Sequence, residues 1–155
     1  RGMDDALAVW QAAQHPFAVV TLDIDHFKRV NDTHGHGVGD QVLQRLAGLM
    51  RENARSDDVL CRVGGEEFLI LLPGASLEVA EQVAQRLRLL LEQADIPPVG
   101  HITLSLGVAH WPQHGSEIAQ VLQVADTALY EAKRTGRNKV VVAADNNQPS
   151  VMKAD

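Results

Sequence analysis

The chain has 155 residues, of which 45% are hydrophobic and 22% are charged, and its formal net charge is −6. This length and composition predict one globular domain with a core of its own. The acidic balance excludes a protein that binds a nucleic-acid polymer through a basic surface, but it permits a nucleotide substrate that brings its own divalent cation. The single cysteine, Cys61, cannot form an intrachain disulfide, which favours a cytoplasmic location.

The sequence carries no apolar run as long as a membrane span and no signal peptide. Because it begins at Arg1 rather than Met and enters a helical pattern almost at once, we interpret it as a domain of a longer protein, whose membrane anchoring the sequence leaves open. Residues 1–144 are expected to form the domain, and residues 145–155 a loose polar tail.

Apolar periodicity predicts an alternation of helices and strands. The expected elements are, in chain order, a helix over about 3–14, a buried strand over 17–24, a short helix over 26–34, a helix over 38–53, two hairpin strands over 59–63 and 67–72, a helix capped by Ser76, a strand over 101–110, a helix capped by Ser116 with Gly136 as its C-cap, and a strand over 139–143. This order predicts an α/β (α+β) fold with one mixed central sheet flanked by helices.

The most informative stretch is the turn between the two hairpin strands, where Gly64-Gly65 precedes Glu66-Glu67. Two glycines can adopt the positive φ angles that a tight hairpin requires. Adjacent carboxylates repel each other, so their presence on the turn favours a bound cation. Acids beside bare backbone indicate a site for a metal and a nucleotide.

Two more acids, Asp23 and Asp25, follow the first predicted strand. Carboxylates at the end of a buried strand suit Mg²⁺, which prefers hard oxygen ligands. A lone D-x-D is more often a simple strand terminus, but together with the hairpin acids it favours a metal site. We therefore expect Asp23 and Glu66 to lie close enough to share an ion.

Several further side chains fit a nucleotide, although each also has a structural interpretation. Lys28 and the run Lys133–Arg137 could clamp phosphates or could be cations that favour a helix C-terminus. Asp40 could accept the two adjacent N–H donors of guanine and Asn31 could meet its acceptors. Taken without context, Asp40 is more often a helix N-cap and Asn31 a turn contact.

Together these residues resemble a known family. The first signature of the GGDEF family, the diguanylate cyclases, is similar to Asp23-Ile24-Asp25-His26-Phe27-Lys28 with Asn31-Asp32, Gly35-His36 and Gly39-Asp40. Gly64-Gly65-Glu66-Glu67-Phe68 resembles the family's signature loop in the Glu variant of active members, and Ala132–Asn138 resembles its last motif. The resemblance spans about residues 1–142, with separated motifs that agree in order and spacing.

The resemblance implies a fold related to nucleotidyl cyclases and the polymerase palm, and the condensation of two GTP into cyclic di-GMP with release of two pyrophosphates. It also implies a role for each matching residue. Two Mg²⁺ or Mn²⁺ ions per active site would be bound by Asp23, the backbone carbonyl of Ile24 and Glu66, and Glu67 would orient a metal or deprotonate the attacking hydroxyl. The guanine base would be bound by Asn31 and Asp40 in a pocket lined by Phe27 and Leu43, the phosphates would be bound by Lys28, Lys133 and Arg137, and Gly64 and Gly65 would leave room for GTP.

The resemblance also implies partners and regulation. Each domain would hold one GTP, so two copies would act as a homodimer. Arg55 and Asp58 have the R-x-x-D spacing of the family's product-inhibition site, with a charged turn after a helix as the structural alternative. An N-terminal regulatory domain is expected to be missing. The alternative function is a non-catalytic receptor for cyclic di-GMP or GTP.

Overall fold

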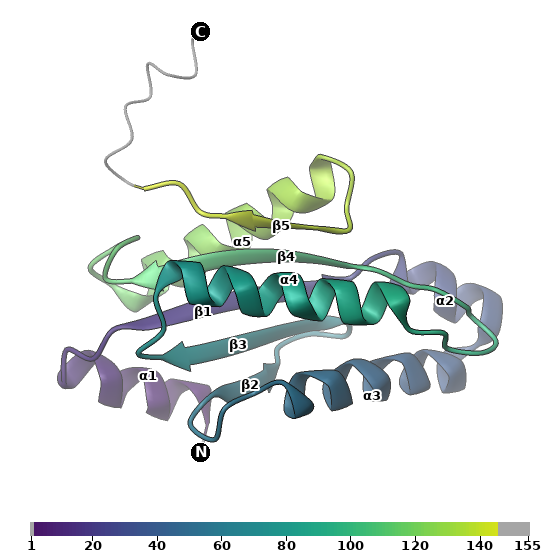
Figure 1. Ribbon diagram of the computed structural model, residues 1–155, viewed down its shortest axis with the longest axis horizontal. Helices are drawn as coiled ribbons and strands as arrows, with labels where there is room; N and C mark the ends of the chain where they lie inside the picture. The colour runs from purple at the N-terminus through teal and green to yellow at the C-terminus, as the bar shows by residue number, and fades with distance from the viewer. Residues whose placement is uncertain (1, 146–155) are drawn as a thin grey trace, which may run out of the picture.

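The computed structural model describes residues 2–145 of the chain. In that range the elements follow one another as α1 (Met3–Ala12), β1 (Phe17–Ile24), α2 (Phe27–His34), α3 (His36–Glu52), β2 (Val59–Arg62), β3 (Glu67–Pro73), α4 (Leu77–Gln93), β4 (Leu104–Trp111), α5 (Ile118–Arg134) and β5 (Lys139–Val142). Figure 1 shows this path from the purple N-terminal helix to the yellow last strand. The predicted order of helices and strands is confirmed.

The described residues form one five-stranded sheet in the order β2-β3-β1-β4-β5. Only β4 and β5 pair in parallel, while the other neighbours are antiparallel. All eight residues of β1 are buried, as the continuous apolar run predicts for a central strand. The predicted mixed sheet is therefore confirmed.

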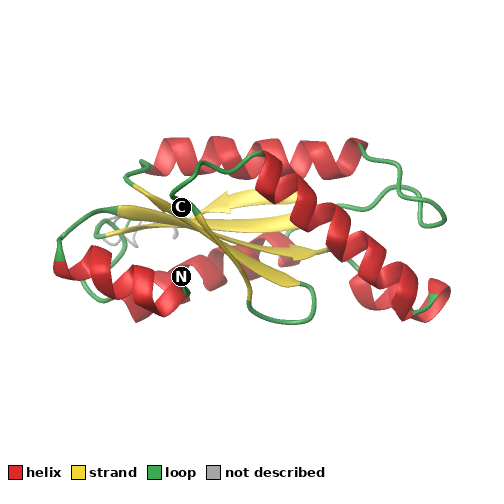
Figure 2. Ribbon diagram, turned by 90° about the horizontal axis from the view of Figure 1, so that it is seen from below, coloured by secondary structure: helices red, strands yellow, loops and turns green. Residues whose placement is uncertain are grey.

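Helices cover both faces of this sheet, as Figure 2 shows edge-on. Alternate residues of a strand point to opposite faces. Ala18, Val20 and Leu22 of β1 join the larger core, to which α2, α3 and α4 contribute. Phe17 and Val19 join the smaller core under α1 and α5. The residues of β1 on this second face are apolar at its start, with Phe17 and Val19, and polar at its end, with Thr21 and Asp23. Asp25, just after the strand, continues the polar side.

Helix α5 lies directly on the sheet because β4 carries a glycine beneath it. A Cβ at Gly107 would lie 2.4 Å from the backbone oxygen of Ala125 and 2.5 Å from the backbone nitrogen of Leu129. No side chain fits there without moving the helix. This close approach brings the C-terminal turn of α5, with Lys133, onto the polar end of β1.

Element boundaries differ from the predicted ones where loop geometry decides them. Helix α3 begins at His36 rather than at residue 38, because Gly35, with φ +89°, is enough to separate it from α2. Strand β4 begins at Leu104 rather than at residue 101, since the chain first makes a tight loop in which the Ile96 and Gly100 backbones bond.

The helix caps follow the predictions only in part. The Ser76 hydroxyl accepts a hydrogen bond from the Val79 amide and caps α4, as predicted. The Ser116 prediction is wrong: Glu117 holds the N-cap position of α5, and the Ser116 carbonyl instead accepts from the Trp111 indole. The predicted C-cap of α5 is off by one residue: Thr135 is the C-cap, and Gly136 follows it with φ +125°.

No helix within residues 2–145 is long and apolar enough to cross a membrane. The predicted tail lies outside the described residues, apart from Asp145.

Candidate functional site

A cleft of about 470 Å³ opens between α2, the start of α3 and the β2–β3 hairpin. Seven of the side chains and glycines predicted from the sequence line it together: Phe27, Lys28, Asn31, Asp40, Leu43, Gly65 and Glu66. These residues come from three separate segments of the chain. His36 and Arg62 also line the cleft, and neither was predicted. The cleft combines apolar side chains with an amide, two carboxylates and two cations, and an apolar wall with a few convergent polar groups is typical of a small-molecule site.

Asn31 and Asp40 stand on consecutive helices, and neither has the structural role that residue statistics favour. Asp40 lies inside α3 rather than at its N-cap, so the capping interpretation is wrong. Asn31 lies within α2 rather than in a turn. A Cβ at Gly39 would lie 1.9 Å from the Asn31 Oδ1, so only glycine at position 39 leaves Asn31 its place in the cleft.

Lys28 lies at the rim of the cleft and is almost free of the protein. Its side chain is 90% exposed, and its ammonium group binds the Asp32 carboxylate at 3.0 Å, one helical turn away. An exposed pair of this kind stabilises the fold by little. The ammonium group is therefore available to an anionic ligand.

The hairpin turn does not use its glycines as the sequence predicts. Neither Gly64 nor Gly65 has a positive φ. The turn closes instead through the Val63 and Gly64 amides, which donate to the Glu67 carbonyl at 2.9 and 3.3 Å. A Cβ at Gly65 would meet no atom of the described chain within 4 Å, so this residue leaves open space at the cleft.

Arg62 holds this turn from the side. Its guanidinium donates three hydrogen bonds, one to the Gly64 carbonyl at 3.2 Å and two to the Gly65 carbonyl at 3.1 and 2.6 Å. These bonds restrict the loop on which Glu66 is mounted. Arg62 thus supports the geometry of the cleft as well as lining it.

Asp23 occupies the polar end of β1, where strand pairing places it opposite Glu67 of β3. The next residue, Ile24, donates its amide to the Glu66 carbonyl at 3.4 Å. The end of β1 and the hairpin acids are thus neighbours along the backbone, and that Asp23 and Glu66 share an ion stays a prediction. Within residues 2–145 no three His, Cys, Asp or Glu side chains gather as a metal cage.

Lys133 of α5 forms an ion pair with the Oδ2 of Asp23. The Asp23 side chain is 7% exposed and the Lys133 side chain 33%. The other carboxylate oxygen, Oδ1, is buried and has no hydrogen-bond partner among the described residues. A buried, unpartnered carboxylate oxygen costs stability unless something binds it. This oxygen therefore fits a cation ligand.

Glu67 points to the α5 side of the sheet rather than into the cleft. The Thr21 hydroxyl donates to its Oε2 at 3.4 Å. Partial burial, followed by the nearby Asp126 and Asp23 carboxylates, raises the pKa of Glu67, and Lys133 opposes this. Partial burial also raises the pKa of Asp126 on α5. Carboxylates with raised pKa values beside a cation are common at functional sites.

Arg137 lies in the turn between α5 and β5, one helical turn beyond Lys133 in the chain. Its side chain is exposed, and one guanidinium nitrogen donates to the Lys133 carbonyl at 3.4 Å. The cleft and the Asp23–Lys133 pair thus occupy opposite sides of the end of β1, joined by the hydrogen bond between Ile24 and Glu66.

Comparison with known proteins identifies this arrangement. Residues 3–139 match the family model described as "Diguanylate cyclase, GGDEF domain". The probable diguanylate cyclase DgcT of Escherichia coli is 44% identical over 136 residues, which cover 84% of this chain and 30% of DgcT. The chain belongs to the GGDEF family. It spans 19% to 38% of the length of five curated relatives.

Solved GGDEF domains share its fold. The active GGEEF domain of a diguanylate cyclase from Vibrio cholerae superimposes with a TM-score of 0.84 at 34% identity, covering 92% of both chains. The GGDEF domain of DgcB from Caulobacter crescentus, solved in complex with c-di-GMP, gives a TM-score of 0.81 at 33% identity, covering 90% of this chain and 85% of that one. The resemblance to the family and the expected fold class are confirmed.

The R-x-x-D pair of this GGDEF domain lies in the turn after α3. An Arg55 guanidinium nitrogen lies 3.4 Å from the Asp58 Oδ1 and also donates to the Pro73 carbonyl at 3.1 Å, while the Arg55 amide donates to the Asp58 Oδ2 at 2.8 Å. The Asp58 side chain is 2% exposed and that of Arg55 53%. The pair closes the turn, and the guanidinium keeps an accessible face. A hollow of about 470 Å³ adjoins it, lined in part by Trp10, Asp57 and Asp58.

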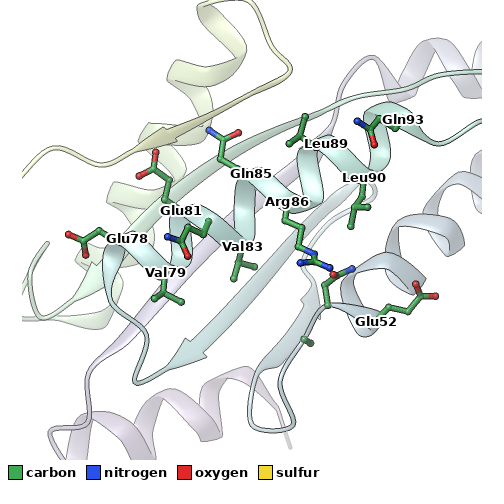
Figure 3. Close-up of a pocket in the computed structure, with 13 residues that line it drawn as sticks. Glu52, Glu78, Val79, Glu81, Val83, Gln85, Arg86, Leu89, Leu90 and Gln93 are labelled. Carbon is green, nitrogen blue, oxygen red and sulfur yellow. The ribbon is translucent and has the colours of Figure 1, made fainter.

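A larger hollow, of about 1090 Å³, runs along the outer side of α4 and shares no residue with the cleft. In Figure 3 the Arg86 side chain reaches from α4 toward the end of α3, where Glu52 lies. Size does not locate the site of this domain: the smaller cleft is the one at which the predicted residues converge.

Sequence reasoning missed three contributors to the site. Arg62 lies two residues before Gly64, and its position next to a glycine turn with bare carbonyls was a usable signal. His36 and Gly39 were quoted within the family motif but received no role. Gly39 could not have been understood from the sequence, because its importance depends on the position of Asn31 in a different helix.

Proposed function

We propose that this GGDEF domain is a diguanylate cyclase, in which two copies condense two GTP into cyclic di-GMP and release two pyrophosphates. The observation that carries the proposal is the convergence of seven predicted residues on one cleft, with a buried carboxylate oxygen of Asp23, unpartnered among the described residues, on the other side of the β1 end. Asn31 and Asp40 would bind the guanine edge, with Phe27 and Leu43 against its faces. Lys28, Lys133 and Arg137 would bind the β- and γ-phosphates.

The residues at the end of β1 fit a divalent cation. The Asp23 Oδ1 has no partner among the described residues and could bind one, Glu66 stands on the neighbouring turn, and Ile24, whose carbonyl would be a further ligand, directly follows Asp23. Two carboxylates and a carbonyl would suffice, since Mg²⁺ commonly takes one or two carboxylates and completes its shell with phosphates and water. When bound, two Mg²⁺ or Mn²⁺ ions would neutralise triphosphate charge and lower the pKa of the attacking 3′-hydroxyl.

The residues of the chain would do the remaining work. The cleft would hold the base so that the triphosphate runs along the hairpin turn, where Gly65 leaves open space. Lys133, held by Asp23, would neutralise the leaving pyrophosphate, and in-line displacement depends mainly on such positioning and charge. Glu67, next to Glu66 in the chain and opposite Asp23 in the sheet, would orient a metal or accept the hydroxyl proton.

Because one domain holds one GTP, the two substrates would meet only across a two-fold dimer. We would measure cyclic di-GMP formation from GTP and Mg²⁺ over a range of protein concentrations. A specific rate that rises with protein concentration would support a cyclase that acts as a dimer. GTP binding without product at any concentration would favour the receptor function instead.

Arg55 and Asp58 are proposed to bind the product and inhibit the enzyme. The accessible face of the Arg55 guanidinium can stack on guanine and bind phosphate at the same time. Arg55→Ala should raise the concentration of cyclic di-GMP that halves the rate, with the initial rate unchanged. Arg51→Ala, at an exposed arginine of α3, is the control. Equal inhibition of Arg55→Ala and the parent would remove this assignment.

A further inference from the structure

The turn that carries Arg137 has an unusual backbone. Gly136, Arg137 and Asn138 are consecutive and all have positive φ angles, of 125°, 64° and 49°. Glycine adopts such angles freely, but arginine rarely does, because its Cβ crowds the next carbonyl oxygen. The conformation therefore needs contacts from outside the turn to hold it.

Those contacts converge on Asn138. Its amide donates to the Oδ2 of Asp25 at 3.0 Å. Its side-chain amide group donates to Glu92 at 2.7 Å and accepts from Arg88 at 3.2 Å, so the C-terminal part of α4 holds the side chain while Asp25 holds the backbone.

Both carboxylate oxygens of Asp25 accept hydrogen bonds within the protein. It is buried, and besides the Asn138 amide it accepts hydrogen bonds from the Thr103 hydroxyl and the Ser105 hydroxyl, each at 2.7 Å. All of its contacts are neutral donors, and both oxygens are used. The second acid of the D-x-D motif therefore differs from the first, whose Oδ1 has no partner among the described residues.

The two acids of this motif fasten the two ends of one turn. Asp23 binds Lys133, which precedes the turn, and Asp25 binds the backbone of Asn138, which ends it. Arg137 lies between these two anchors. We propose that Asp25 is a positioning residue, which sets where the Arg137 guanidinium meets the phosphates of GTP by fixing the Asn138 backbone. This inference rests on the proposed function, in which Arg137 binds phosphate.

A double-mutant cycle would test it. The probes are the unreactive analogue α,β-methylene-GTP with Mg²⁺, and guanosine, which has no phosphate. Asp25→Ala and Arg137→Ala should each weaken binding of the analogue about 10-fold, the effect of losing one charge-assisted hydrogen bond. The double variant should bind no more weakly than Arg137→Ala alone, because Asp25 acts only through Arg137. Guanosine affinity should stay at the parent value throughout.

Further variants separate positioning from folding. Asp25→Asn keeps the shape and one acceptor oxygen, so it replaces Asp25→Ala in the cycle if the alanine variant fails to fold. It should weaken binding of the analogue about 3-fold, again without effect in the Arg137→Ala background. Ser105→Ala removes a different hydrogen bond of Asp25 and Asp95→Ala removes an exposed acid, and both should bind like the parent. Hydrogen exchange should show lost protection of the Asn138 amide in the Asp25 variants while the β4 amides keep theirs.

The outcomes are distinct. Effects of Asp25 and Arg137 variants that multiply to about 100-fold, or an Asp25 variant that binds like the parent, would overturn the inference and leave the proposed function standing. A parent that binds neither probe would overturn the proposed function, and the inference with it.

Discussion

The two sides of the β1 end are built differently. On the cleft side the polar groups of α2, α3 and the hairpin turn are exposed or half-buried, and Lys28 at the rim is 90% exposed. The α5 side is built around the buried Asp23, which already forms an ion pair with the half-buried Lys133. The polar groups of the cleft side are therefore accessible to water and to a ligand, whereas the Asp23–Lys133 pair is already fixed by contacts within the folded domain.

This difference separates two ways to organise a site. Exposed groups cost the fold little, but only local packing keeps them in position, as Gly39 does for Asn31. Buried groups are held precisely where they are, but they couple the site to the stability of the domain. Substitutions on the cleft side should therefore change activity alone, and substitutions on the α5 side should change stability too.

The largest expected effect tests the cleft side. Glu66→Gln should lower the rate of cyclic di-GMP formation at least about 100-fold, because metal stabilisation of charge is worth several kcal/mol. The melting temperature should stay at the parent value, since Glu66 is only half-buried and its side chain makes no hydrogen bond within residues 2–145. Glu78→Gln, at an exposed glutamate of α4, is the control. Unchanged turnover would remove Glu66 from the site.

A pair of lysine variants contrasts the two sides directly. Lys133→Met leaves the buried Asp23 carboxylate without its cation, so it should lower the free energy of unfolding by about 2 kcal/mol. Lys28→Met breaks only an exposed pair and should cost less than about 0.5 kcal/mol. Urea denaturation measures both. Equal losses of stability would contradict the division between the two sides.

Two glycine variants in one helix sharpen the comparison on the cleft side. Gly39→Ala places a Cβ against the Asn31 Oδ1, the far end of a flexible side chain, so Asn31 should turn away while α3 stays intact. The KM for GTP should rise about 10-fold, the loss expected when hydrogen bonds to a base edge are removed. Gly37→Ala meets no atom within 4 Å and should leave KM unchanged. A parent-like KM in Gly39→Ala would show that Asn31 does not bind substrate.

Much of this architecture could be predicted from local patterns. The apolar run at 17–24 is buried along its whole length, and the Ser76 cap is where a serine before a periodic apolar stretch predicts it. The cleft residues were identifiable because their spacing matches a family motif.

Other features depend on contacts between distant segments. In the sequence Gly107 is an ordinary glycine within a strand, and only the structure shows that the backbone of α5 packs against it. The hairpin glycines show the same limit, because their expected positive φ angles are absent and the turn closes through backbone bonds to Glu67. The separate roles of Asp23 and Asp25 follow from partners more than 75 positions away in the chain, which no local pattern contains.

The smallest expected effect concerns Asp126, on the α5 side. Partial burial raises its pKa, and Lys133 and the Thr21 hydroxyl oppose this, so the folded domain binds the Asp126 proton more tightly than the unfolded chain does. The stabilising contribution of the protonated form is then full below the unfolded pKa and lost as the pH rises through the folded pKa. Asp126→Asn, which stays neutral, should therefore stabilise the domain at pH 7 and leave it unchanged at acidic pH.

The gain should be no more than a few tenths of a kcal/mol, because solvent screens a group that is more than a third exposed. Urea unfolding at pH 3 and pH 7 measures the difference, with Asp95→Asn as the exposed control. Destabilisation at pH 7 would mean that the attraction of Asp126 for Lys133 outweighs its burial, so that even this outer acid belongs to the ion-pair network that holds the α5 side together.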